Sequence, residues 1–151
     1  MKRLATTLFC IVVALVACAG TIPPHRSGPL PEKALRITTI PTQYADWWKA
    51  VEDCSGHTKP LSSVTWYLVA TTSYRGFLWR NPYKGTTEWV AGLAYSDRSV
   101  IVMGSGWLFS GPEVRHEMLH LIGSPLGHSP ELYQDKCKDV VSCVGQCLDG
   151  P

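Results

Sequence analysis

The segment from Ser110 to Gly123, SGPEVRHEMLHLIG, contains signals for both the start and the end of a helix. Ser110 and Glu113 have the spacing of a capping box, and Pro112 is tolerated in the first turn because the backbone N–H that it lacks has no intrahelical partner there. Gly123 predicts a left-handed residue after the last turn, and Pro125 prevents the helix from continuing. The sequence therefore predicts a helix of about three turns, around which the remaining chain has to pack.

This predicted helix carries a His-Glu-x-x-His pattern. His116 and His120 are four residues apart, so both imidazoles project from one face and can reach the same metal ion, while Glu117 lies beside them. Two neutral imidazoles suit Zn²⁺, which lowers the pKa of a bound water to roughly 7, and a carboxylate can accept a proton from that water. The alternative is that the two histidines only solvate the helix surface. The helix caps and a further histidine downstream favour the metal site.

The residues HEMLHLIGSPLGH, at positions 116–128, resemble the zincin metallopeptidases, and their HExxHxxG part is similar to the metzincin signature. The resemblance implies a zinc-dependent peptidase in which His116 and His120 bind Zn²⁺ and Glu117 is the general base. In metzincins a third histidine follows the glycine by three residues, where this chain has Leu126. The family also has a methionine-containing turn beneath the metal, and no methionine follows position 128 in this sequence.

His128, two residues after Leu126, is our preferred third metal ligand. A catalytic zinc takes three protein ligands and keeps one position for water, and the Pro- and Gly-containing stretch after Gly123 allows the chain to bend back under the helix. Glu131 is the other candidate, because a carboxylate oxygen also binds zinc. A third interpretation makes His128 a surface residue in a turn. Tyr133 is more typical of packing than of oxyanion stabilisation.

Residues 1–17, MKRLATTLFCIVVALVA, resemble the signal peptide of a bacterial lipoprotein, with Cys18 as the lipid attachment site. Two basic residues precede an apolar run that is short for a transmembrane helix and that ends in small residues. Residues 18–34 are rich in Pro and Gly without periodicity, which predicts a tether. We therefore expect a lipid-anchored protein at the cell envelope, in the outer membrane if the organism has one. An ordinary secretory signal is the alternative.

Removal of residues 1–17 changes the charge balance of the chain. Lys2 and Arg3 leave with this segment, so fourteen basic residues become twelve, against twelve acidic residues. A formally neutral chain lacks the electrostatic footprint of a nucleic-acid-binding protein, so we expect no nucleic acid as a partner. Residues 35–151 are enough for one domain with a hydrophobic core, which we expect to be monomeric and to bind a peptide or protein substrate.

Besides Cys18, four cysteines remain after the signal peptide: Cys54, Cys137, Cys143 and Cys147. An exported protein meets an oxidising compartment, in which an even number of cysteines favours two disulfides. Three pairings are open, and we favour Cys54 with Cys137 and Cys143 with Cys147, because the tail otherwise keeps an unpaired thiol. A zinc cluster of thiolates is the alternative, although it usually needs close C-x-x-C pairs.

The remaining patterns predict an α+β fold. Thr42 offers an N-cap for a helix that ends near Cys54, and residues 96–98 are a connection short enough for an antiparallel hairpin. We expect strands at residues 35–40, 64–72, 88–95 and 99–103, and a loop at 73–87 that borders the cleft. The zincin resemblance implies a small mixed sheet packed on a backing helix and on the HExxH helix, with an edge strand above the metal for an extended peptide.

The metal pattern is compatible with two other classes of function. A non-catalytic lipoprotein could use zinc only to hold its fold, which requires a fourth protein ligand and no open position for water. A zinc-binding interaction module would bind the metal but have an occluded cleft. We favour the peptidase, in which Glu117 passes its proton to the leaving amine.

Overall fold

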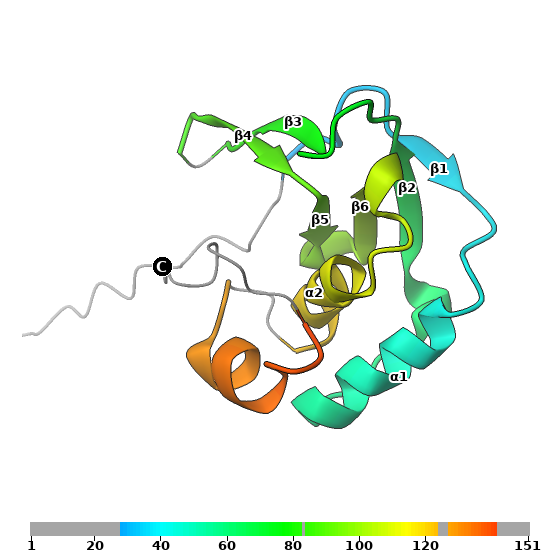
Figure 1. The fold of residues 1–151 in the computed structure, drawn as a ribbon, viewed down its shortest axis with the longest axis vertical. Helices are drawn as coiled ribbons and strands as arrows, with labels where there is room; N and C mark the ends of the chain where they lie inside the picture. The colour runs from blue at the N-terminus through cyan, green and yellow to red at the C-terminus, as the bar shows by residue number, and fades with distance from the viewer. Residues whose placement is uncertain (1–27, 83, 124–126, 142–151) are drawn as a thin grey trace, which may run out of the picture.

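The computed structural model describes residues 28–82, 84–123 and 127–141. It shows an α+β fold, in which a four-stranded mixed sheet has helices on one face and a two-stranded hairpin over the other (Figure 1). In these three ranges, no helix is long and apolar enough to cross a membrane. The predicted signal peptide, Cys18 and the predicted Cys143–Cys147 disulfide lie outside the described residues.

The main sheet has the strand order β1-β2-β6-β5. Its members in chain order are β1 (Leu35–Ile37), β2 (Thr65–Val69), β5 (Gly92–Tyr95) and β6 (Val100–Gly104). β2 and β6 are parallel, whereas β1 and β5 pair antiparallel with their neighbours. The strands predicted at 35–40, 64–72 and 99–103 are therefore confirmed with shifted ends. β5 is an edge strand, and its antiparallel pairing with β6 turns at residues 96–98 as predicted.

Alternate residues of β6 face two separate cores. Met103 packs with the helices α1 (Tyr44–Ser55) and α2 (Gly111–Ile122), whereas Val102 packs with the hairpin on the opposite face. Both helices lie close to where the sequence predicts them. α2 contacts α1 on one side and the edge strand β5, whose four residues are buried, on the other, so the predicted His-Glu-x-x-His helix lies beside this edge strand (Figure 1).

The loop predicted at residues 73–87 is wrong in part, because it contains a strand. β3 (Phe77–Arg80) pairs antiparallel with β4 (Thr87–Val90) and forms the second, two-stranded sheet. Side chains in β3 alternate between buried and exposed. This alternation covers only four residues between a glycine and a proline, so it is too short to predict a strand against such strong turn signals.

The single strand predicted at residues 88–95 is divided in the structure. β4 pairs with β3 in the hairpin, whereas β5 pairs with β6 in the main sheet. Ala91 lies between the two strands, and its carbonyl oxygen accepts a hydrogen bond from the Gly104 N–H at 2.9 Å. The chain therefore changes partners at Ala91, which a continuous strand-like sequence pattern does not reveal.

The predicted helix ends differ in detail from the observed ones. The N-cap residue of α1 is Gln43 rather than Thr42, and no side chain caps this helix. Gly123 has a φ of −127°, so the left-handed end predicted for α2 is absent at this residue. The Ser110 hydroxyl donates a hydrogen bond to the carboxylate of Glu113 and accepts none from a backbone N–H of the first turn. The position of α2 therefore depends on packing more than on its caps.

Residues 28–34, which belong to the predicted tether, pack against the folded domain. Leu30 and Ala34 contact the core between the sheet and the hairpin. The guanidinium of Arg98 donates a hydrogen bond to the carbonyl oxygen of Gly28. Leu30, Ala34 and Gly28 of the predicted tether therefore lie against the folded domain.

Residues 127–141 are attached to both helices. Cys137 forms a disulfide with Cys54 near the end of α1, which is the predicted pair, and the two Cα atoms are 5.2 Å apart. Arg115 of α2 donates a hydrogen bond to the carbonyl oxygen of Val140. The covalent bond and the hydrogen bond hold this segment against the helix side of the domain.

Replacement of both cysteines, Cys54→Ser with Cys137→Ser, should lower the free energy of unfolding by about 2–5 kcal/mol, because the crosslink joins residues 83 positions apart. Urea unfolding followed by circular dichroism measures this difference. Reduction of the wild-type protein should cause at least as large a loss. Equal unfolding midpoints for the double variant and the oxidised wild type would contradict the expectation.

Candidate metal centre

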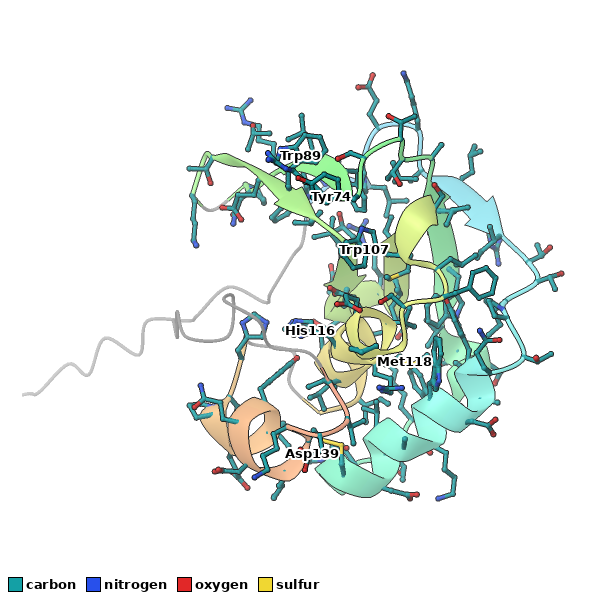
Figure 2. All side chains as sticks on the ribbon, in the orientation of Figure 1. Tyr74, Trp89, Trp107, His116, Met118 and Asp139 are labelled. Atoms are coloured by element: carbon teal, nitrogen blue, oxygen red, sulfur yellow. A yellow bond between two sulfur atoms is a disulfide. The ribbon has the colours of Figure 1, made fainter. Side chains whose placement is uncertain are left out.

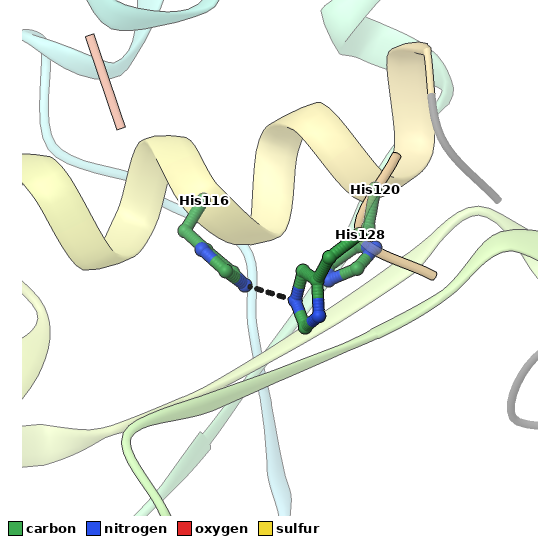
Figure 3. A group of neighbouring side chains, drawn as sticks. All are labelled: His116, His120 and His128. Carbon is green, nitrogen blue, oxygen red and sulfur yellow. Dashed lines mark hydrogen bonds between the residues drawn. The ribbon is translucent and has the colours of Figure 1, made fainter. Parts of the chain in front are cut away.

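Three histidines meet beside α2 (Figure 3). His116 and His120 project from the helix, and His128 approaches from the segment that follows it. The Nε2 atoms of His116 and His128 are 3.0 Å apart, and one ligand atom from each histidine lies within 4.8 Å of the others. The structure therefore brings the three predicted metal ligands together in one group.

The group has a buried side and a more open side. His120 is only 4% exposed, whereas His116 and His128 are half-buried. Figure 2 shows His116 between the hairpin, where Trp89 is labelled, and the C-terminal segment, where Asp139 is labelled. Solvent can therefore reach the group from the side of His116 and His128 but not from the side of His120.

Local backbone geometry explains the position of each histidine in the group. His116 and His120 share a face of α2 because they are four residues apart on a helix. Gly127 precedes His128 with a φ of +114°, a conformation that residues with a side chain rarely adopt. The bend that the sequence predicts from glycine and proline in this stretch thus includes a position that only glycine suits.

The donor set fits a transition-metal ion. Two nitrogen ligands on a tetrahedral zinc are about 3.3 Å apart when each Zn–N distance is about 2.05 Å. The closest pair in this group, His116 and His128, is at 3.0 Å. Two imidazole nitrogens this close repel unless a proton or a cation lies between them, and neutral imidazoles suit zinc, copper, iron and nickel. The group can therefore hold a metal ion.

Glu131, the other predicted candidate for the third ligand, does not belong to this group of described residues. It is exposed, and its carboxylate accepts a hydrogen bond from Nζ of Lys136 at 2.6 Å. This hydrogen bond and the charge of Lys136 hold the pKa of Glu131 below its ordinary value. Of the two candidates, the structure places only His128 beside the helix histidines.

The carboxylate predicted as a general base, Glu117, is buried where α2 meets β5. Its side chain is 6% exposed. A Cβ atom on Gly92 would lie 2.8 Å from Cγ of Glu117 and 2.7 Å from Sδ of Met103, which is closer than real side chains approach. Gly92 therefore leaves the space that Glu117 occupies. The only sequence signal for this role of Gly92 is a glycine inside a strand pattern, which does not reveal the residue that it faces.

Tyr133 packs beside all three histidines. Its ring centroid lies 5.1 Å from that of His116, 5.3 Å from that of His120 and 4.8 Å from that of His128. The residue is 1% exposed and belongs to a π-helical turn at Glu131–Lys136. Tyr133 therefore packs as predicted, and the residues that it packs against are the three candidate ligands. Its ring limits the rotation of their imidazoles.

Comparisons with models of known protein families, with curated protein sequences and with solved structures find no match to this chain. The chemical class of the site therefore follows from its own geometry. It is a three-histidine group with a buried carboxylate, Glu117, on the helix that supplies two of the histidines.

His128→Ala should weaken metal binding by more than about 100-fold, because even residues that only orient a metal ligand contribute 10- to 100-fold. Glu131→Ala should change the affinity little, since Glu131 lies outside the group. Competition of each purified variant with a chromogenic chelator for Zn²⁺ measures both effects. The opposite ranking of the two variants would assign the third ligand to Glu131.

Gly92→Ala should lower the free energy of unfolding by about 1–3 kcal/mol, because the added methyl group overpacks the space between β5 and α2. Gly106→Ala is the matched control, since a Cβ there would meet its nearest neighbour, Oγ1 of Thr71, at an ordinary 3.5 Å. Thermal and urea unfolding of both variants provide the comparison. Equal stability of the two would show that Glu117 and Met103 move aside without loss.

Proposed function

We propose that this protein is a zinc-dependent peptidase of the bacterial cell envelope. The observation that carries the proposal is the group of three histidines with Glu117 on the same helix. Within the residues that the structure describes, the group supplies three protein ligands, which is the number in catalytic zinc sites, whereas structural sites have four. The half-buried state of His116 and His128 supports access for water and substrate.

In this proposal His116, His120 and His128 would hold the zinc ion, which when bound would lower the pKa of a water molecule to roughly 7 and polarise a carbonyl group. Glu117 accepts a proton from the attacking water and transfers it to the amine nitrogen as the C–N bond breaks, so that peptide and water become a carboxylate and an amine. Tyr133 keeps the imidazoles oriented throughout.

The proposed substrate is an extended peptide segment beside β5. This strand is at the edge of the main sheet, and it contacts α2, the helix that carries Glu117. Its four residues are buried, so in this proposal the peptide displaces what covers the edge and then pairs with the main chain of β5, with specificity left to the pockets for alternate side chains. The zincin-like sequence at 116–128 supports the same placement of a peptide along an edge strand above the metal.

The proposal places the enzyme in the envelope as a monomer attached through lipid on Cys18. Support comes from the lipoprotein-like sequence at residues 1–17 and from the disulfide between Cys54 and Cys137, which requires an oxidising compartment. The formally neutral chain that remains after Lys2 and Arg3 are removed supports a peptide or protein substrate over a nucleic acid.

Glu117→Gln should retain one zinc ion per chain and the stability of the wild type, while it lowers peptide hydrolysis by about 10²- to 10⁴-fold, because proton transfer is lost and the ligands are intact. Metal analysis of the protein purified from membranes, combined with mass spectrometry of a digested peptide library, tests both parts.

Glu113→Gln is the control, because it makes the same chemical change at another residue of α2. Glu113 accepts a hydrogen bond from Ser110 and lies outside the histidine group. It should leave zinc content and hydrolysis unchanged. Full hydrolysis by Glu117→Gln would refute the role of this carboxylate. Release of zinc by the same variant, or a wild-type zinc ion with four protein ligands, would support the structural-zinc alternative.

A further inference from the structure

One face of the β3–β4 hairpin points away from the domain and carries exposed apolar side chains. Leu78 and Trp89 are directly opposite each other in the antiparallel pair, so both lie on this outer face, and they are 56% and 41% exposed. Tyr74, in the connection before β3, is 80% exposed. Figure 2 shows Trp89 and Tyr74 at the hairpin end of the molecule. Phe77 and Trp79 of β3, by contrast, pack on the sheet.

The exposed charged side chains of β3 and of the connections on either side of it are basic. Arg80 shares the face with Leu78, and Arg75 and Lys84 are exposed in the connections on either side of β3. The acidic residue of the hairpin, Glu88, is opposite Trp79, so it belongs to the other face, and it accepts a hydrogen bond from Thr86. The outer face therefore combines an apolar centre with positive charge.

The chain reaches the folded domain beside this hairpin. A Cβ atom on Gly28 would lie 3.4 Å from Cγ of Pro82, which follows β3 by two residues. Figure 1 shows the first described residues next to the hairpin. Cys18 precedes Gly28 by ten positions, and ten residues span at most about 36 Å when fully extended. A lipid on Cys18 would thus hold this end of the domain close to the membrane.

We propose that the outer face of the β3–β4 hairpin rests on the anionic phospholipid surface to which the protein is anchored. Trp and Tyr favour the boundary between acyl chains and water, and Arg and Lys cover apolar surface while their charges reach the headgroups. Each basic side chain near an anionic surface adds to the attraction. The contact of this face with a phospholipid surface is too weak to anchor a protein alone, but the proposed lipid on Cys18 would keep the protein at the membrane.

This inference depends on lipid attachment at Cys18, which belongs to the proposed function, but not on hydrolysis. The full chain, purified from membranes, is reconstituted into vesicles of phosphatidylethanolamine and phosphatidylglycerol that contain brominated acyl chains. Bromine should quench the tryptophan fluorescence of the wild type, and Trp89→Phe should remove most of that quenching. Iodide in the aqueous phase should reach Trp89 in detergent but not in vesicles.

Leu78→Asp should lose most of the bromine quenching, because it adds a negative charge to the apolar centre of the face. Phe109→Asp is the matched control, since Phe109 is 69% exposed and lies outside the hairpin, and it should be quenched like the wild type. Hydrolysis of a soluble peptide should be unchanged in Leu78→Asp, so a failure of docking remains distinct from a failure of the proposed peptidase activity.

Three results would overturn the proposal. The first is quenching that persists in Trp89→Phe, and the second is a wild-type chain that carries no lipid and does not associate with the vesicles. The third is protection of Trp89 from iodide by a peptide without vesicles, together with an absence of bromine quenching. That last result would assign the outer face to substrate binding.

Discussion

The attachment of residues 127–141 to α1 and α2 is the constraint on which the site depends. His116 and His120 are neighbours because of helix geometry alone, but His128 reaches them only if this segment folds back under α2. The Cys54–Cys137 disulfide, the buried Tyr133 and the hydrogen bond from Arg115 hold it there. The position of His128 therefore depends on contacts between parts of the chain that are distant in sequence.

A metal ion would strengthen the same attachment. Binding by three histidines couples the energy of coordination to the energy of folding, because an unfolded chain does not hold the three ligands together. The ion and the disulfide would then both hold the segment of residues 127–141 in place. The ion would hold it at His128, and the crosslink holds it at Cys137. Tyr133 lies between His128 and Cys137 along the chain, and its ring contacts all three imidazoles.

Most parts of the structure that the sequence predicts are local, and the exceptions are the Cys54–Cys137 pair and His128, which follow from the number of cysteines and of zinc ligands and not from periodicity. The bounds of α2, the shared face of His116 and His120 and the α+β class follow from helix periodicity and short strand patterns. β3 is not predicted because its four alternating residues lie among strong turn signals, and the identity of Ala91 does not indicate that the chain changes sheets there. The role of Gly92 depends on how close β5 comes to Glu117, a tertiary distance that the identity of a single glycine does not encode.

The Cys54–Cys137 crosslink also ties the timing of site assembly to the compartment. In a reducing cytosol both thiols stay free, and the segment that carries His128 is then held only by non-covalent contacts. If the protein is exported as proposed above, oxidation of the two cysteines would add a covalent constraint to these contacts. The redox state of the compartment would then set how firmly His128 is held beside the two helix histidines.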